Sequence, residues 1–466
     1  MTVTPLRRRN VPEVIESAGI TRRQWLYFVL IFLLLLTDGM DSTVVSHIFP
    51  SLIKEWGVSV GGGIALVVSG GFVAMGIGAF AAGRLADRWG RKSLLVAVGF
   101  LFSITTALGG TADDYTAFTI WRLIACFGIG AVLPTAVTLL ADLVPERRRG
   151  AMIAAAYAGL GLGTTAGATL AGVILPLEGW RTLMVVAGIL PAIITVLIWV
   201  GIPESPTFLV TRGKTERARR SLSRIFPHID LETVDLIAPD KKIESSGTFR
   251  RLLSRPFALT TVLLWVFGFA SLGTQMLVIQ YLPTLLQLPT PGLTTVQSST
   301  IVASYGFASV ISLLLLGVVL VKLPHVQTIA ACLTVSAIVA IAVSMSSTAG
   351  FTTLLVVLTV AGFFLPAALG PTRNILSVHA YPTDMRATGV GMTELSARVG
   401  SAGQGAIGGI LIGAGLGLGG FFLTLLLPLG ILGVTLAGLA IAGRPQQASN
   451  PEPSDIPNPE SVLPRV

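Results

Sequence analysis

Two aspartates, Asp38 and Asp41, lie inside the long apolar run LLLLTDGMDSTVV. An ionised carboxylate at the centre of a membrane helix costs on the order of 2.5 to 3.5 kcal/mol by insertion scales. Their i, i+3 spacing places both on one helix face, and two neighbouring carboxylates outside bulk water raise the proton affinity of at least one. The pair is predicted to be a protonation switch. The alternative is a pair of packing carboxylates held by hydroxyls such as Thr37 or Ser42.

Two arginines, Arg122 and Arg398, lie inside other apolar runs and are the corresponding buried cations. A guanidinium can hold a carboxylate through two parallel hydrogen bonds, so both are candidate ligands of an anionic substrate. Two structural alternatives stay open. Arg398 could pair with Glu394, one helical turn earlier, and Arg122 could neutralise Asp38 or Asp41.

The connection GRLADRWGRK joins the second and third apolar runs. Gly83 and Gly90 would let helix ends approach each other closely, and Asp87 can reach a helix N-terminus, where negative charge is stabilised. Together with Arg88 and Arg91, these residues form a candidate gate.

More charges follow the fourth apolar run. Asp142, Glu146 and the arginines at 147–149 are close in sequence, and with Arg88 they could form a charge cluster that latches two halves of the molecule together. Breaking such a latch would be a step of alternating access.

The remaining residues that could do chemistry give weaker signals. His47, near the outer end of the first run, and the three histidines beside later connections are interpreted as solvated surface residues. Cys126 and Cys332 lack the spacing of a metal site or a disulfide framework, and no Ser/His/Asp set or phosphate loop occurs. The sequence therefore predicts neither an enzyme nor a metal or cofactor site.

The elements that position these residues must be membrane helices. Of 466 residues, 52% are hydrophobic and 12% are charged, which is about half the charged share of a soluble protein. The net charge of +9 comes from basic residues that separate long apolar runs. This arrangement favours a membrane surface over nucleic acid as the partner.

Because a spanning helix needs roughly 20 apolar residues, we expect twelve of them. The candidate segments are 24–48, 63–82, 93–110, 115–141, 149–173, 180–202, 257–281, 297–321, 326–345, 350–378, 387–413 and 420–443.

The basic connections alternate with nearly uncharged ones, and basic connections face the cytoplasm. We therefore expect a multi-pass protein of the inner (plasma) membrane with both termini cytoplasmic. Its parts would be an N-terminal segment (1–23), a six-helix bundle (24–202), a cytoplasmic linker (203–256), a second bundle (257–443) and a disordered tail (444–466). Within the linker, residues 215–226 are predicted to form an amphipathic helix on the inner leaflet.

A repeat supports the division into two halves. Four positions recur at a constant offset of 237 residues: Pro134, Pro145, Arg149 and Gly172 correspond to Pro371, Pro382, Arg386 and Gly409. Two parallel halves of common plan are one of the known architectures of transporters.

The connection GRLADRWGRK closely resembles the signature loop of the major facilitator superfamily, and residues 122–134 (RLIACFGIGAVLP) resemble its helix 4 motif. Within that superfamily, four stretches resemble the aromatic acid:proton symporters: DGMD, PTAVTLLADLVPERRRG, YLPTLLQ and YPTDMRATGVGMTELSARVGS. The resemblance covers nearly the whole chain. It implies an all-α membrane fold of 12 helices in two pseudo-symmetric six-helix bundles.

The resemblance also implies import of an aromatic carboxylate, such as a benzoate or hydroxybenzoate, together with a proton. Asp38 and Asp41 match the acids of the family's first helix, and Arg122, Arg386 and Arg398 match its functional arginines. Of these, Arg386 is expected to belong to the gate and cytoplasmic latch. One stretch departs from the family: GVVLVKLPHVQ, between helices 8 and 9, lacks the usual Asp and Arg. Gating in the second half is therefore in question.

Two other functions compete with this one. A sugar or drug carrier of the same superfamily is suggested by Pro203-Glu204-Ser205-Pro206, and a membrane sensor could signal through 203–256 or the tail without transport. Under the leading hypothesis we expect a monomer whose partners are the aromatic acid, the proton and the lipid bilayer.

Overall fold

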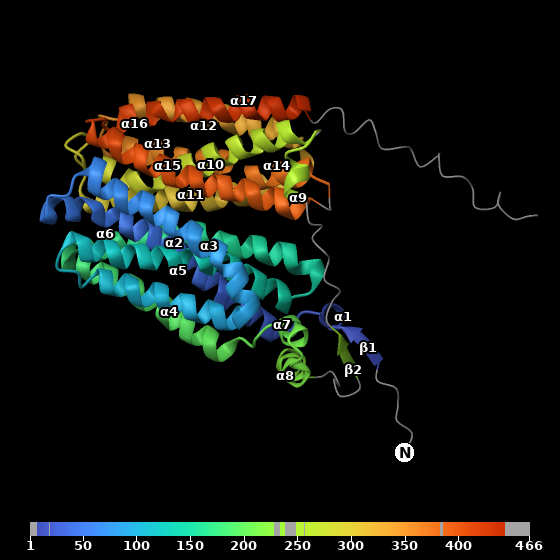
Figure 1. Ribbon diagram of the computed structural model, residues 1–466. Helices are drawn as coiled ribbons and strands as arrows, with labels where there is room; N and C mark the ends of the chain where they lie inside the picture. The colour runs from blue at the N-terminus through green and yellow to red at the C-terminus, as the bar shows by residue number, and fades with distance from the viewer. Residues whose placement is uncertain are drawn as a thin grey trace, which may run out of the picture.

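The computed structural model of the chain describes residues 7–17, 19–227, 234–237, 248–255, 257–382 and 385–442. Most of these residues are helical, and the long helices form two bundles that lie side by side (Figure 1). The predicted tail at 444–466 and much of the predicted linker, at 228–233 and 238–247, lie outside the described residues.

The first bundle contains the six spans that we expected. They are α2 (Arg22–Trp56), α3 (Ala65–Trp89, preceded by the π-helical turn Val60–Ile64), α4 (Arg91–Gly109), α5 (Tyr115–Leu143) and α6 (Glu146–Gly201). Helix α6 holds two of them, because Gly179 in its middle has φ 79° and ψ 179°, which is not helical.

The second bundle repeats this plan. Its helices are α10 (Ala258–Gln287), α11 (Thr295–Lys322), α12 (His325–Met345), α13 (Phe351–Leu369), α14 (Thr372–Ala380), α15 (Arg386–Gly413), α16 (Leu418–Thr424) and α17 (Leu426–Ala442). By length and composition, ten stretches of the described chain could cross a membrane. Dividing α6 at Gly179 and adding α15, which is long enough but less apolar, gives the twelve helices expected.

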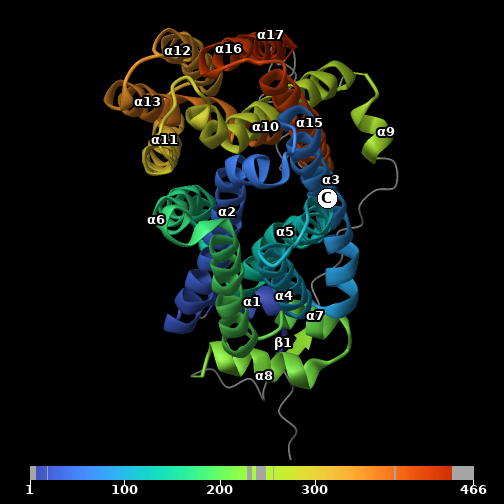
Figure 2. The same cartoon turned by 90° about the vertical axis from the view of Figure 1, so that its left-hand side faces the viewer.

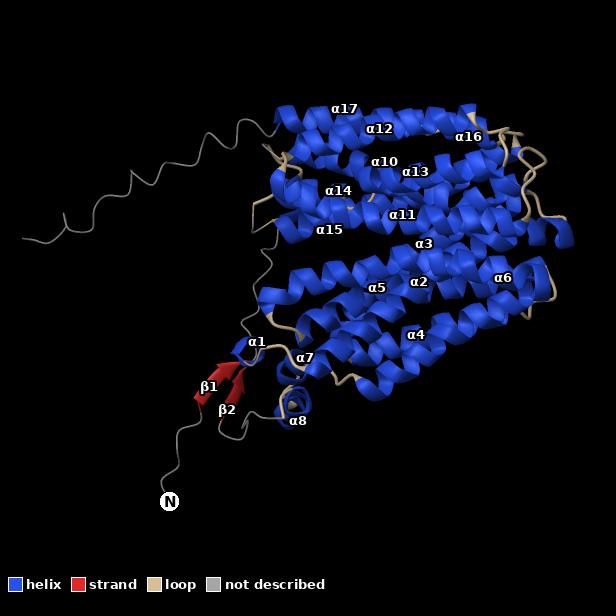
Figure 3. Cartoon of the chain, turned by 180° about the vertical axis from the view of Figure 1, so that it is seen from behind, coloured by secondary structure: helices blue, strands red, loops and turns tan. Residues whose placement is uncertain are grey.

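Several short elements gather at one end of the molecule, which we call the α7–α8 end (Figure 3). They are β1 (Arg7–Asn10), α1 (Val11–Ser17), α7 (Pro206–Thr211), α8 (Thr215–Ile225), β2 (Val234–Ile237) and α9 (Thr248–Leu252). Strands β1 and β2, which we did not expect, pair in parallel. Helix α8 is the predicted amphipathic helix, but its apolar side chains Leu222 and Ile225 are buried in the core of the first bundle. That face packs on protein and not on a lipid leaflet.

The two bundles contact each other mainly along two helix pairs, α6 with α11 and α3 with α15, and α2 also contacts α10 (Figure 2). At the end opposite α7 and α8, the π-helical turn before α3 packs closely on α15: a Cβ added to Gly413 would lie 3.1 Å from the Cα of Gly61. Toward the α7–α8 end of the same two helices, a Cβ added to Gly83 or to Gly391 would meet nothing within 4 Å. The structure is therefore closed at the end opposite α7 and α8.

The predicted repeat is visible in these contacts. Gly172, on α6 of the first bundle, packs on Ser299 of the second, and its counterpart Gly409, on α15 of the second bundle, packs on Ala65 of the first. Equivalent glycines of the two halves thus lie at equivalent places in the contact, as expected for two pseudo-symmetric bundles.

Candidate functional site

An ion pair between Asp41 on α2 and Arg122 on α5 lies in the interior of the first bundle. Arg122 Nη1 is 2.6 Å from Asp41 Oδ2, and the two side chains are 6% and 0% exposed, respectively. The hydroxyl of Thr106, on α4, donates to the other carboxylate oxygen of Asp41 at 3.3 Å. Of the alternatives that the sequence left open for Arg122, the structure shows the one in which it neutralises an acid of α2.

Asp38 lies one turn earlier on α2 and is also buried, with 6% of its surface exposed. Within the described part of the chain it has no hydrogen bond and no ion pair. It interacts electrostatically with Asp41 and Arg122 of its own half and with Arg398 of the other half. Thr37 does not hold it, because the Thr37 hydroxyl donates to the Leu34 carbonyl at 2.8 Å. Asp38 is therefore a buried carboxylate without a fixed partner.

Close packing between α2 and α6 sets the position of both aspartates. A Cβ added to Gly39 would lie 2.9 Å from the Cα of Leu160, and one added to Gly163 would lie 2.7 Å from the amide nitrogen of Met40. Only glycine fits where two helix backbones come this near. Gly39 and Gly163 thus let α2 and α6 approach each other closely.

Arg398, on α15 of the second bundle, is half-buried and forms no ion pair or hydrogen bond with any residue that the structure describes. The alternative in which Glu394 pairs with it is wrong. Glu394 is instead held by Arg373 of α14, whose Nε and Nη2 donate to the two carboxylate oxygens at 2.9 and 3.2 Å. Arg398 is thus left without a carboxylate partner.

A small cavity lies beside Arg122 where the two bundles meet. Its walls are mostly apolar, and Ser42, Arg122 and Gln280 are the polar or charged side chains that line it. The remaining lining residues are Val45, Phe49, Val67, Val68, Gly71, Phe72, Met75 and Cys126. Its free volume is only about 20 Å³, far below the several hundred Å³ of a typical small-molecule site, so in this state it marks a polar spot between the bundles and does not hold an aromatic acid. A second hollow, between α6, α11 and α13, has no charged lining residue and is not a candidate for binding an anion.

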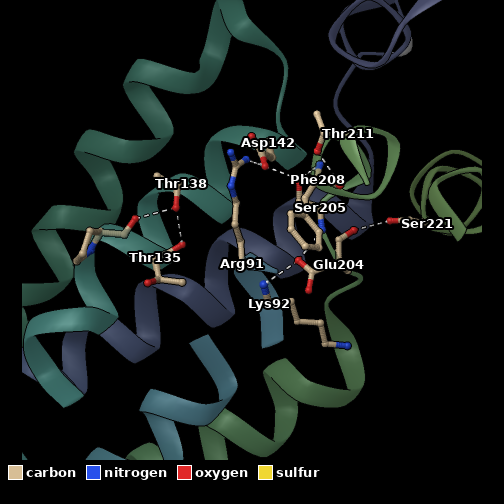
Figure 4. Close-up of polar contacts among 11 residues, drawn as sticks. Arg91, Lys92, Thr135, Thr138, Asp142, Glu204, Ser205, Phe208, Thr211 and Ser221 are labelled. Carbon is tan, nitrogen blue, oxygen red and sulfur yellow. Dashed lines mark hydrogen bonds and ion pairs between the residues drawn. The ribbon is translucent and has the colours of Figure 1, made fainter. Parts of the chain in front are cut away.

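A polar cluster at the start of α4 contains part of the predicted gate (Figure 4). Arg91 forms an ion pair with Asp142, at the end of α5, and the Ser205 hydroxyl donates to Asp142 as well. Glu204 caps α4 by accepting from the Lys92 amide at 2.9 Å. We call Arg91, Asp142, Glu204 and Ser205 the α4 cluster. All four residues belong to the first half or to the chain directly after it, so in this state they connect parts of one bundle and do not latch two bundles together.

Gly90 gives this cluster its geometry. Its φ of 100° is in the region that favours glycine, and a Cβ at this position would lie 3.0 Å from Cε1 of Phe208 and closer still to the Glu204 carboxylate. Gly90 thus lets the connection turn between α3 and α4 while Glu204 reaches the N-terminus of α4.

The other predicted gate residues lie outside this cluster. Asp87 and Arg88 are exposed in the last turn of α3 and Gly83 is exposed one to two turns earlier. Arg88 has no ion pair with any described residue. Arg386, at the start of α15, donates from Nε to the Tyr381 carbonyl at 3.4 Å. The structure therefore brings together Gly90, Arg91 and Asp142, keeps Asp87 within electrostatic range of Arg91, and leaves Gly83, Arg88 and Arg386 apart from them.

The expectation that His47 is a solvated surface residue is wrong. His47 is 1% exposed, and its Nδ1 lies 2.8 Å from the Thr43 carbonyl of the preceding turn. The residue lies near the end of α2, where apolar neighbours from both bundles enclose the helix.

Arg373 is the charged residue that the sequence analysis missed. It is 8% exposed and lies near the start of α14. It falls within the predicted span 350–378, so the signal that singled out Arg398, a cation inside an apolar segment, could have identified it.

The comparisons with known proteins agree with this arrangement. A model of the Major Facilitator Superfamily matches residues 31–402. The fold resembles that of the solved D-xylose-proton symporter, with a TM-score of 0.70 at 15% sequence identity over 88% of this chain and 96% of that one.

Two curated relatives from Pseudomonas putida match most of the chain. The 4-hydroxybenzoate transporter PcaK is 30% identical over 434 residues, which are 92% of this chain and 96% of that protein. A gallate transporter is 30% identical over 420 residues, 90% of this chain and 92% of that protein. The chain, a multi-pass membrane protein, therefore belongs to the major facilitator superfamily, whose members are transporters and not enzymes.

Proposed function

We propose that this transporter imports an aromatic carboxylate together with a proton by alternating access. The main support for the proposal is that each half contains one buried charge in excess of its ion pairs, which we call its leftover charge. In the first half Asp38 and Asp41 face Arg122 alone, so one negative charge remains. In the second half Glu394 is held by Arg373, so the positive charge of Arg398 remains.

A proton and a carboxylate would neutralise these two leftover charges. The proton would neutralise Asp38 or Asp41, and the substrate carboxylate would bind Arg398, or Arg122 once its own pair opens. With both bound, no uncompensated charge is buried when the halves close. With one bound, a single charge is left between them, and a buried unpaired charge is costly. This difference would couple the proton to the substrate.

The empty carrier can also close, because Asp38 and Arg398 then attract each other across the two halves. Loaded and empty forms would therefore exchange between the two sides, whereas half-loaded forms would not. That is the rule of a symporter. Because the basic connections belong to the α7–α8 end, we assign this end to the cytoplasm of an inner (plasma) membrane. Both termini are then cytoplasmic, and the structure is the inward-facing state of a carrier that acts as a monomer.

The names of the two relatives support the choice of an aromatic acid. One is named a 4-hydroxybenzoate transporter and the other a gallate transporter. The sugar-carrier alternative rested on the segment Pro203-Glu204-Ser205-Pro206. In the structure, Glu204 caps α4 and Ser205 binds Asp142, so these residues have structural partners and do not line the cavity beside Arg122.

Uptake by the purified protein in liposomes tests the proposal. Labelled 4-hydroxybenzoate should enter under an imposed inward proton gradient, and a panel of hydroxylated and methoxylated benzoates should compete with it. Xylose and cyclic polyols should not compete. Competition by the sugars but by none of the benzoates would favour the sugar carrier, and binding of benzoates without any flux would favour a sensor.

A further inference from the structure

Arg373 is held firmly in the second bundle. Helix α13 ends at Leu369 and α14 begins at Thr372, and Arg373 Nη1 donates to the Gly370 carbonyl in this break at 2.6 Å. Its other donors hold both oxygens of Glu394. A guanidinium with these three contacts is fixed in orientation, and the two-bond contact with a carboxylate is the stronger kind.

Glu394 has a second cation within reach. Arg398 follows it by four residues on α15, and a glutamate four residues before a cation is the favourable arrangement for a helix pair. Glu394 interacts electrostatically with both arginines, more strongly with Arg373 than with Arg398. Glu394 thus has two possible partners, and Arg373 holds it in this structure.

The three charges face the first bundle. Tyr157, on α6, interacts electrostatically with Glu394, Arg398 and Arg373, and Asp38, on α2, interacts with Arg398. Which arginine holds Glu394 therefore decides whether a positive charge faces Asp38 and the substrate.

We infer that Arg373 is a positioning residue: it holds Glu394 and so leaves Arg398 free to bind the substrate carboxylate. This inference rests on the proposed function. Without Arg373, Glu394 turns to Arg398 and competes with the substrate. The apparent affinity is then the intrinsic affinity multiplied by the fraction of molecules in which Arg398 is still free.

The test is the initial rate of 4-hydroxybenzoate uptake by proteoliposomes as a function of substrate concentration. If Glu394 occupies Arg398 in about nine molecules of ten, Arg373→Met raises KM about tenfold, while the maximal rate changes much less. Removing the competitor as well, in Arg373→Met/Glu394→Gln, returns KM to within about twofold of wild type. Arg373→Lys, which keeps a cation for Glu394, stays near the wild-type KM.

A structural role for Arg373 predicts a different pattern. If the double variant is as impaired as Arg373→Met, or if Arg373→Met has the wild-type KM, the inference is wrong. Thermal unfolding of each variant shows whether the protein is folded, and recovery of KM in the double variant cannot come from a misfolded protein. If wild type transports none of the aromatic acids, the proposed function fails and the inference fails with it. If wild type transports them and only the Arg373 pattern is absent, the inference alone fails.

Discussion

We propose that single buried charges decide what each half of this protein can bind. Asp38 lies between an ion pair in its own half and an arginine without a partner in the other half. The two leftover charges have opposite sign, as a proton and a carboxylate require. At the residue scale, we therefore propose that the proton binds in the first half and that the substrate carboxylate binds Arg398 of the second.

Replacing Asp38 with asparagine should separate proton coupling from substrate binding. Asp38→Asn carries no charge and resembles the protonated acid, so the loaded form can still close. We expect accumulation of 4-hydroxybenzoate driven by a proton gradient to be lost, and exchange of labelled for unlabelled substrate at equal pH to continue. Asp113→Asn, which changes an exposed carboxylate, is the matched control. Gradient-driven accumulation by Asp38→Asn would rule out its role in coupling.

Arg122 should matter for stability as well as for transport. Arg122→Met leaves Asp41 buried without its partner, which costs about 3 to 5 kcal/mol when a buried pair is broken from one side. Asp41→Asn/Arg122→Met removes both charges, so most of the stability should return, while transport should not. The melting temperature of the purified variants measures the first effect and liposome uptake the second. Equal melting temperatures for Arg122→Met and wild type would contradict the pairing.

These residues differ in how well the sequence predicts them. The sequence identifies four of them, Asp38, Asp41, Arg122 and Arg398. A charged side chain inside an apolar run is costly, and such residues usually have a function. The sequence does not identify the partner of Glu394, because Arg373 is 21 residues away and on another helix. The sequence shows only the i+4 neighbour, and the break between α13 and α14 decides the pairing.

At the scale of the helices, glycine sets where the charges lie. Helix α2 carries both aspartates and approaches α6 at Gly39 and Gly163, where backbones are in contact. Moving α2 outward would separate Asp41 from Arg122. Tight packing of α2 against α6 is thus a condition for the ion pair.

Gly163→Ala should therefore destabilise the protein. An added methyl group in a close-packed contact costs about 1 to 3 kcal/mol, and the resulting shift of α2 should also reduce uptake. Gly76→Ala is the control, since a Cβ at Gly76 meets nothing within 4 Å. Thermal unfolding gives the melting temperatures of the Gly163→Ala and Gly76→Ala variants, which are then compared. A melting temperature for Gly163→Ala equal to that of Gly76→Ala would mean that α2 and α6 are not packed this closely.

Most long helices could be predicted from hydropathy, including the boundary at Gly179 that separates the two spans within α6. The short elements could not. Strands β1 and β2 pair across more than two hundred residues, and no local pattern specifies such a pairing. The amphipathic pattern of α8 was correct, but periodicity alone does not tell a protein surface from a lipid surface.

Considered as a whole, the molecule is closed at the end opposite α7 and α8. Equivalent glycines of the two halves, Gly172 and Gly409, lie in this closure, so the repeat in the sequence corresponds to a symmetric contact. The repeat predicted two halves, but it could not predict which end is closed, because both states are made from the same sequence.

A disulfide across the closed end should hold the protein in this state. Gly61 and Gly413 are near enough, since an ideal Cβ on either lies 3.7 Å or less from the other Cα, and the Cβ atoms of a disulfide are about 3.8 Å apart. In a background with Cys126→Ala and Cys332→Ala, oxidised Gly61→Cys/Gly413→Cys should form the bond and lose uptake, and reduction should restore it. Each single variant is a control. Full uptake in the oxidised, bonded form would show that this end does not open during transport.

Movement of protons with the substrate tests the central claim most directly. Liposomes that contain the protein and a pH-sensitive dye start at equal internal and external pH, and 4-hydroxybenzoate is added outside as its anion. If the two leftover charges are neutralised together, the interior of the liposomes becomes acidic as substrate enters, and the signal disappears in Asp38→Asn. Uptake of labelled substrate by the wild-type protein without any movement of protons would contradict the account.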